Sequence, residues 1–312
     1  MSIKHPGIAL RERLLCELDL TLERVFDTNA HEPDKDVCLV KDVRGQRWVL
    51  RSGERRNPSL FPNGFVGEHV VIPTIHITSA APVYELEQYL EGDLAVDSDR
   101  MPNAPFPQIE ILDLMFLAFW EWQKIGNLAP LQSQESHAET HLQLALLLIS
   151  DDRQKSVKAA IDCYRAFFDD VSYPAKWKYS DDNLLLMADG KLGFIDNARM
   201  GLRFWGYDIG WIYWPRWFRM GQEAWGTPDT YIARFERFLS DWYASKPSDI
   251  ALDRTTFDQR VHLGLLTRIV GALFDVHKRI SHAEHWLDTH ERRSRFLSWT
   301  TALLDWNLKK LM

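Results

Sequence analysis

The sequence is short of cysteine, of basic residues and of long apolar runs. Its three cysteines, Cys16, Cys38 and Cys163, lack the spacing of metal ligands, and so sparse a set is typical of a reducing compartment. The 37 basic residues face 44 acidic ones, which gives a net charge of −7. A surface for nucleic acid needs clustered Lys and Arg, so we expect no nucleic-acid partner.

No apolar run approaches the length of a membrane span. The run at 145–150 (ALLLIS) is far too short to cross a bilayer. The first residues, MSIKHPGIALRER, lack the charged-then-apolar order of a signal peptide. We therefore expect a cytoplasmic protein without a membrane partner.

Tryptophan, by contrast, is abundant. The chain of 312 residues contains 13 Trp, most of them after position 118, and 46% of its residues are apolar. That apolar share is ordinary for a soluble globular protein. The Trp distribution predicts either a dense aromatic core or an aromatic-lined groove in the second half.

The first ninety residues have mostly β-type patterns. Residues 8–25 have the apolar spacing of a helix, and 37–51 form two β-rich runs around a turn at 42–45. Residues 66–77 and 83–90 are also strand-like. We predict a β-rich domain over residues 1–90.

The rest of the chain has helical periodicity. Two short strand patterns, 183–187 and 191–196, flank a turn at 188–190, and the pattern is helical again from 208 onward. The long apolar-periodic helices are expected at 111–125, 140–149 and 157–168. We predict an α+β protein whose second domain, residues 91–312, is helical.

The segment 176–213, KWKYSDDNLLLMADGKLGFIDNARMGLRFWGYDIGWIY, carries the most specific pattern. It resembles the catalytic segment of the aminoglycoside phosphotransferase and choline kinase group. That group reads His-Gly-Asp, four residues, Asn, a hairpin, Ile-Asp, and a further Asp about a dozen residues on. Asn183 and Asp196 match its metal-binding positions, and Asp208 matches its buried Asp that braces the catalytic loop.

The resemblance implies a two-lobed, protein-kinase-like fold with a small β-rich N-lobe and a large helical C-lobe. It also implies ATP or another nucleotide bound with Mg²⁺ between the lobes, and a small hydroxyl compound as phosphoryl acceptor. Phosphoryl transfer depends mainly on metal, charge neutralisation and alignment. The oxygen ligands of Asn183 and Asp196 suit Mg²⁺.

The chain departs from this family where the catalytic base is expected. Lys178 occupies the position of the catalytic Asp, and Lys176 and Trp177 occupy those of the preceding His and Gly. A lysine does not accept a hydroxyl proton unless its pKa is strongly depressed. Three interpretations stay open: transfer is lost, Asp181 or Asp182 serves as a relocated base, or Lys178 neutralises phosphate in another reaction such as nucleotidyl transfer.

In the small lobe, RWVLRSG (47–53) resembles the third strand of a kinase lobe. Arg51 then takes the position of the lysine that binds the α- and β-phosphates, and Glu68 is our candidate for its helical acidic partner. The run 83–92 resembles the hinge strand, in which Gln88 to Leu90 are expected to contact adenine.

No Gly-rich phosphate loop is present, and the acidic stretch 29–36 stands in its place, where it would repel a triphosphate. We therefore predict a kinase-like small-molecule phosphotransferase homologue whose transfer activity is retained, altered or lost. The alternative is a non-catalytic pseudokinase that acts as a ligand-binding or regulatory module.

Simpler interpretations apply to several motifs. Asn183 and Asp196 would also suit a solvent-facing polar hairpin. His137 and His141 have the spacing of zinc ligands on a helix, although most such histidines are solvated or satisfied in a core. The Trp-rich stretch 205–225 is interpreted as helix packing, with a groove for an aromatic or sugar-like ligand as the alternative.

Overall fold

The computed structural model describes most of the chain, in two compact units. The β-rich unit contains Met1–Leu94 and Asn183–Gly201, and the helical unit contains Ala95–Asp182 and Leu202–Met312. The hairpin after residue 183 thus belongs to the β-rich unit, whereas we predicted it in a helical domain beginning at 91. The residues described are 6–26, 34–56, 61–95, 109–124, 143, 146, 149–170, 172–177, 179–180, 183–212, 227–280 and 289–312.

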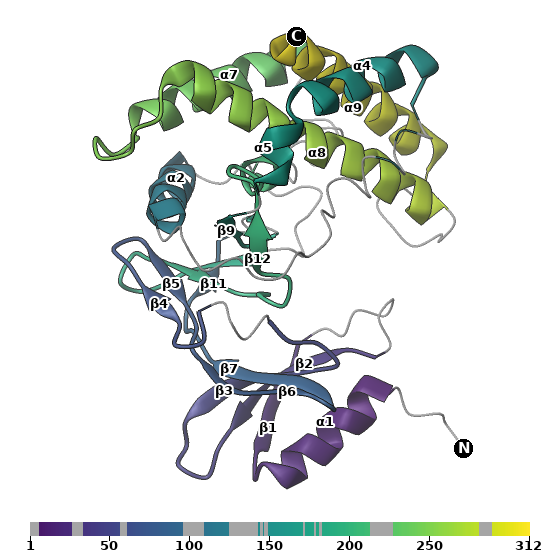
Figure 1. Cartoon of the computed structure of the whole chain (residues 1–312). Coiled ribbons are helices and arrows are strands. Elements are labelled where there is room, and N and C mark those ends of the chain that lie inside the picture. Colours follow the sequence, from purple (N-terminus) through teal and green to yellow (C-terminus); the bar gives the residue numbers. More distant parts are fainter. Residues whose placement is uncertain are drawn as a thin grey trace. The chain divides into compact units, whose positions relative to one another are not determined.

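The β-rich unit contains one helix and two five-stranded sheets among its described residues (Figure 1). The order of the first sheet is β1-β2-β3-β7-β6, and that of the second is β4-β5-β11-β10-β8. The bounds are α1 Pro6–Glu17, β1 Thr21–Val25, β2 Asp36–Lys41, β3 Arg47–Ser52, β4 Phe65–Val66, β5 Val70–Ile72, β6 Ile75–Ala80, β7 Val83–Gln88, β8 Asp93–Leu94, β10 Leu184–Leu186 and β11 Leu192–Phe194.

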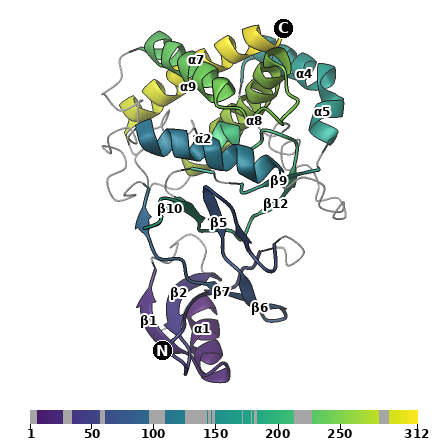
Figure 2. The ribbon, with the colours of Figure 1, turned by 90° about the vertical axis from the view of Figure 1, so that its left-hand side faces the viewer.

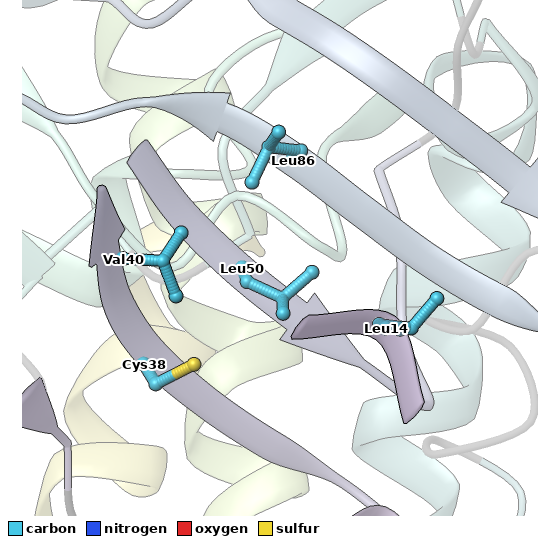
Figure 3. Close-up of a cluster of buried hydrophobic side chains, with 5 residues drawn as sticks. All are labelled: Leu14, Cys38, Val40, Leu50 and Leu86. Atoms are coloured by element: carbon cyan, nitrogen blue, oxygen red, sulfur yellow. The ribbon is translucent and has the colours of Figure 1, made fainter. Parts of the chain in front are cut away.

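One face of the first sheet packs against α1. Leu14 of the helix meets Cys38 and Val40 of β2, Leu50 of β3 and Leu86 of β7, and all five side chains are buried (Figure 3). Because side chains alternate along a strand, the residues between them point to the opposite face. That opposite face carries the charged residues of the candidate site.

The predicted helix over 8–25 is wrong in its second half. Helix α1 ends at Glu17, Asp19 adopts a positive φ of 51°, and Thr21–Val25 form strand β1. A positive φ ends a right-handed helix, and the residues that follow pair with β2. The apolar run 66–77 is likewise divided into three strands rather than forming one.

The helical unit is made of helices and one two-stranded sheet, β12-β9, in the part of it that the structure describes. Figure 2 shows α7, α8 and α9 together, with α4 and α5 beside them. The bounds are α2 Ile109–Lys124, α4 Asp151–Cys163, α5 Arg165–Asp169, β9 Tyr173–Ala175, β12 Gly201–Arg203, α7 Pro228–Ala244, α8 Arg254–Ile280 and α9 His290–Leu311.

Aromatic side chains form the core of the helical unit. Trp242 of α7 stacks on Phe116 of α2, with ring centroids 4.4 Å apart and an interplanar angle of 12°. Phe119 packs edge-on against Trp242 and Trp205, at 4.8 and 5.6 Å. The predicted aromatic core is confirmed, and Trp205 belongs to it. Residues 213–225 of the Trp-rich stretch lie outside the described residues.

No helix among the described residues is long and apolar enough to cross a membrane.

Candidate functional site

Asn183 and Asp196 stand at neighbouring strand ends of the β-rich unit. Strands β10 and β11 pair antiparallel, Leu184 opposite Phe194, and the Ile195 N–H donates to the Asn183 carbonyl at 3.2 Å. Asn183 is buried, whereas the Asp196 side chain is 43% exposed. Asp196 also has a positive φ of 55°, a conformation that Asp tolerates better than most residues. The hairpin therefore presents one amide and one carboxylate from adjacent strand ends.

Arg51 lies beside this hairpin and is surrounded by carboxylates. Its Nε and Nη2 donate to Glu87 Oε1 at 3.1 and 3.0 Å. Its Nη1 donates to Glu54 Oε1 at 3.4 Å and is 3.7 Å from Asp196 Oδ1. Burial alone would lower the pKa of Arg51, but the charges of Glu87, Asp196 and Glu54 outweigh it and raise that pKa. The guanidinium is thus a buried, permanently charged group next to Asp196.

A second buried pair, Arg56 and Glu85, lies close to the first. The Arg56 N–H donates to Glu85 Oε2 at 2.9 Å, and Arg56 Nη2 donates to the Pro73 carbonyl at 2.8 Å. Burial and the neighbouring charge of Glu87 raise the pKa of Glu85 to about 7, although Arg56 opposes the shift. Burial of Glu85 beside Glu87 thus places two acids of β7 within one buried cluster of charged side chains.

Asp208 fixes the segment that begins at Lys176 in the helical unit. Its carboxylate is buried and accepts the backbone N–H of Lys176 at 2.7 Å and of Trp177 at 3.0 Å. Burial raises the pKa of Asp208 to about 6, and those two hydrogen bonds with the charge of Lys176 limit the rise. The prediction that Asp208 is a buried brace of this segment is confirmed.

Three solved structures resemble the chain over nearly its whole length. An amicoumacin kinase in complex with AMP-PNP, Ca²⁺ and Ami is 12% identical over 96% of this chain and 92% of its own, with a TM-score of 0.60. The choline kinase of Streptococcus pneumoniae is 12% identical over 95% and 98%, with a TM-score of 0.56. An aminoglycoside phosphotransferase of Alicyclobacillus acidocaldarius is 9% identical over 96% of each chain, with a TM-score of 0.51.

The chain has a choline kinase-like fold. This confirms the fold that the 176–213 segment predicted: mixed α and β, with strands in the N-terminal region and helices in the C-terminal part. No sequence-family model matches the chain, and no curated protein is significantly similar to it in sequence.

Trp177 stands at the position for which the resemblance of the 176–213 segment implies a glycine. Trp177 has a positive φ of 84°, in the region that favours glycine. Its side chain is buried, with the Arg203 guanidinium 5.2 Å from the ring centroid and the Tyr207 ring 5.6 Å away. The Trp177 indole is thus well packed although a positive φ is unfavourable for tryptophan.

The three candidate catalytic residues, Lys178 and the possible bases Asp181 and Asp182, lie outside the described residues. So do residues 29–33 of the acidic loop and the pair His137 and His141. Within the described ranges, no group of three or more His, Cys, Asp or Glu residues could hold a metal ion.

Glu68 is not on a helix, contrary to our expectation for the partner of Arg51. It lies exposed in the turn between β4 and β5, and no described residue between β3 and β6 is helical. The acids that contact Arg51 are Glu87, Glu54 and Asp196. The pattern VYELEQ contains a clue that we missed, because Glu85 and Glu87 alternate onto one face of β7, and Glu85 pairs directly with Arg51 across the sheet.

The expected hinge follows strand β7. The Gln88 N–H donates to the Thr74 carbonyl at 2.9 Å, so this amide pairs within the sheet. Leu90 is buried in an apolar cluster with Val71 and Leu185. Leu185 is on β10, so this buried cluster includes a residue of the hairpin that carries the two candidate metal ligands.

We expect Glu85→Gln to stabilise the β-rich unit by about 2 kcal/mol near pH 8 and to have little effect near pH 5. A carboxyl group whose pKa rises from 4.5 to about 7 on folding takes up protons, so stability falls as pH rises through that interval. Glutamine stays neutral and keeps an oxygen for the Arg56 N–H. Urea unfolding at both pH values measures the difference. Glu17→Gln, on the exposed end of α1, should show no such pH dependence, and equal effects at both pH values would contradict the prediction.

Proposed function

We propose that this protein binds a nucleotide together with Mg²⁺ on its β-rich unit, as a homologue of small-molecule phosphotransferases. The observation that carries the proposal is the placement of Asn183 and Asp196 at adjacent strand ends, with Arg51 3.7 Å from Asp196. An ordinary polar hairpin has no need of a buried arginine at that point. The choline kinase-like fold supports the same assignment.

The donor set fits Mg²⁺ better than a transition metal. Asn183 and Asp196 offer oxygen ligands only, and Mg²⁺ is usually held by one or two protein oxygens together with nucleotide phosphates. When bound, the ion neutralises and aligns the phosphates. Asn183 and Asp196 would hold it, Arg51 would lie against the phosphates, and Gln88 to Leu90 would contact the base. The acceptor would be a small hydroxyl compound.

Whether phosphoryl transfer persists depends on the residues before Asn183. In an active enzyme Asp181 or Asp182 would take the proton of the acceptor hydroxyl, with Lys178 neutralising phosphate charge. The second candidate function is a ligand-binding module without turnover. It is favoured by the state of Arg51, whose Nε and Nη2 are both occupied by Glu87. Donors that pair with Glu87 and Glu54 are not available to a phosphate unless those pairs break.

A thermal-shift titration with ATP, with and without Mg²⁺, tests nucleotide binding. Ligand at a hundred times its Kd should stabilise the wild type by about 2.7 kcal/mol. We expect Asp196→Ala to lose the Mg²⁺-dependent part of this stabilisation. Asp189→Ala, in the exposed turn of the same hairpin, is the matched control and should behave as wild type. Absence of stabilisation in the wild type would reject nucleotide binding in both candidate functions.

Phosphate release from ATP then separates turnover from binding. An active phosphotransferase should lose release in Asp196→Ala and keep it in Asp189→Ala. Equal rates in wild type and Asp196→Ala would exclude catalysis and leave the ligand-binding module.

A further inference from the structure

The acid that holds Arg51 belongs to the sheet itself. In protein kinases a helix supplies the glutamate that pairs with the phosphate-binding lysine, and movement of that helix makes or breaks the pair. Here Glu87 comes from β7, the strand next to β3, and the register places Arg51 opposite Glu85 and Glu87 opposite Val49. The pair therefore forms whenever the sheet forms.

The surroundings of Arg51 are rich in negative charge. Glu87, Glu54 and Asp196 all lie within 3.7 Å of the guanidinium. The nearby cation Lys35 pairs with Glu54 at 3.0 Å. Among the described residues, Arg51 and Lys35 face these three carboxylates, and with the neighbouring pair of Arg56 and Glu85 the group has three cations and four acids.

A phosphate that approaches Arg51 must approach these carboxylates as well. Two unit negative charges about 5 Å apart at an effective dielectric constant near 20 weaken binding on the order of a hundredfold. A divalent cation on Asn183 and Asp196 would cancel this repulsion. The site should therefore bind a free nucleotide much more weakly than the Mg²⁺ complex of the same nucleotide.

We infer that Glu87 is a specificity-determining residue, which holds Arg51 so that a nucleoside diphosphate binds only as its complex with a divalent cation. The inference rests on the proposed function, because it assumes that nucleotide binds beside Arg51. The role differs from that of the helix glutamate in protein kinases, which holds the phosphate-binding lysine in place for catalysis.

Calorimetric titration of the full chain with ADP, once with Mg²⁺ and once with EDTA, tests the inference. Adenosine is the reference ligand without phosphate. For the wild type we expect ADP to bind about a hundredfold more weakly in EDTA. For Glu87→Gln we expect the affinity for ADP in EDTA to rise about tenfold. Its affinities for adenosine and for ADP with Mg²⁺ should stay within about twofold of the wild-type values.

Glu17→Gln makes the same change of net charge at an exposed site of the β-rich unit and should leave the Mg²⁺ dependence as in wild type. Glu54→Gln is the second variant, in case Glu87→Gln does not fold. Because Glu54 makes a single, longer contact with Arg51, we expect the affinity of Glu54→Gln for ADP in EDTA to rise by about threefold.

The outcomes separate the two hypotheses. A wild type that binds neither adenosine nor ADP with Mg²⁺ rejects the proposed function, and the inference with it. A wild type that binds ADP equally well with Mg²⁺ and with EDTA rejects only the inference. Weaker ADP binding by Glu87→Gln in both solutions would also overturn it, because Glu87 would then position Arg51 for phosphate instead of restraining it.

Discussion

Gly53→Ala is expected to unfold the β-rich unit, at a cost of more than about 4 kcal/mol. Gly53 follows β3 with a φ of 84°, and a Cβ there would lie 1.9 Å from the Asp34 carbonyl oxygen. Real atoms never approach so closely, so residues 34 and 35 would have to move. Lys35 also packs tightly against the α1 backbone, because a Cβ added at Gly7 would lie 2.8 Å from the Lys35 carbonyl carbon.

Gly190→Ala is the matched control for this variant. Gly190 has nearly the same φ, 81°, and lies in the β10–β11 turn of the same unit, but a Cβ there meets nothing within 4 Å. Gly190→Ala should lower the free energy of unfolding by only about 1 kcal/mol, the cost of a positive φ at alanine. Urea unfolding of the two variants measures the contrast. Equal losses would show that contact with Asp34 contributes nothing.

Asp208→Ala is expected to destabilise the helical unit by about 4 kcal/mol. The two carboxylate oxygens accept separate buried amides, Lys176 N–H and Trp177 N–H, and alanine leaves both without an acceptor. Each buried amide without a partner costs about 1–3 kcal/mol. The positive φ of Trp177 would also lose the contact that holds it. Hydrogen exchange at these two amides should therefore accelerate together with the loss of stability.

Asp253→Ala, just before α8, is the control for Asp208. Asp253 also accepts two hydrogen bonds, from the Thr256 N–H at 2.9 Å and the Thr256 hydroxyl at 2.7 Å, but it is exposed, so water can replace it. Its loss should cost about 1 kcal/mol, as for an N-cap. A cost at Asp208 no larger than this would refute the bracing role.

The positions of Asn183 and Asp196 at neighbouring strand ends could be predicted because local structure determines them. A turn at 188–190 between two short strands places Asn183 beside Ile195 whatever the rest of the fold does. Asp208 was predictable only through the family resemblance, because its hydrogen bonds reach back more than thirty residues. Such contacts leave no periodic signal in the sequence.

The acids around Arg51 were missed for a related reason. The family resemblance predicts a helical partner for Arg51, for which Glu68 was the candidate. The observed partner, Glu87, depends on which strands become neighbours in the sheet. Strands β3 and β7 are separated by three strands in the chain but adjacent in space. Alternation placed Glu85 and Glu87 on one face, but only the strand order places that face over Arg51.

Helix α1 shows the limit of periodicity over a short distance. The apolar spacing of residues 8–25 continues past Glu17, yet Thr21–Val25 pair with β2. Pairing of residues 21–25 with β2 is more favourable than a longer helix whose second half would have no apolar surface to pack against.

The pairing of β11 with β5 has a consequence for synthesis of the chain. Val70 and Val71 lie next to Leu192 and Gly193 in a parallel pair, so the second sheet draws on segments about 120 residues apart. At about 5–20 residues per second, a nascent chain waits on the order of ten seconds between making the first segment and the second. During that interval Val71 and Leu90 lack Leu185, their apolar neighbour in the finished protein. The ribosome-bound chain should therefore present this half-built sheet to chaperones until the β10–β11 hairpin emerges.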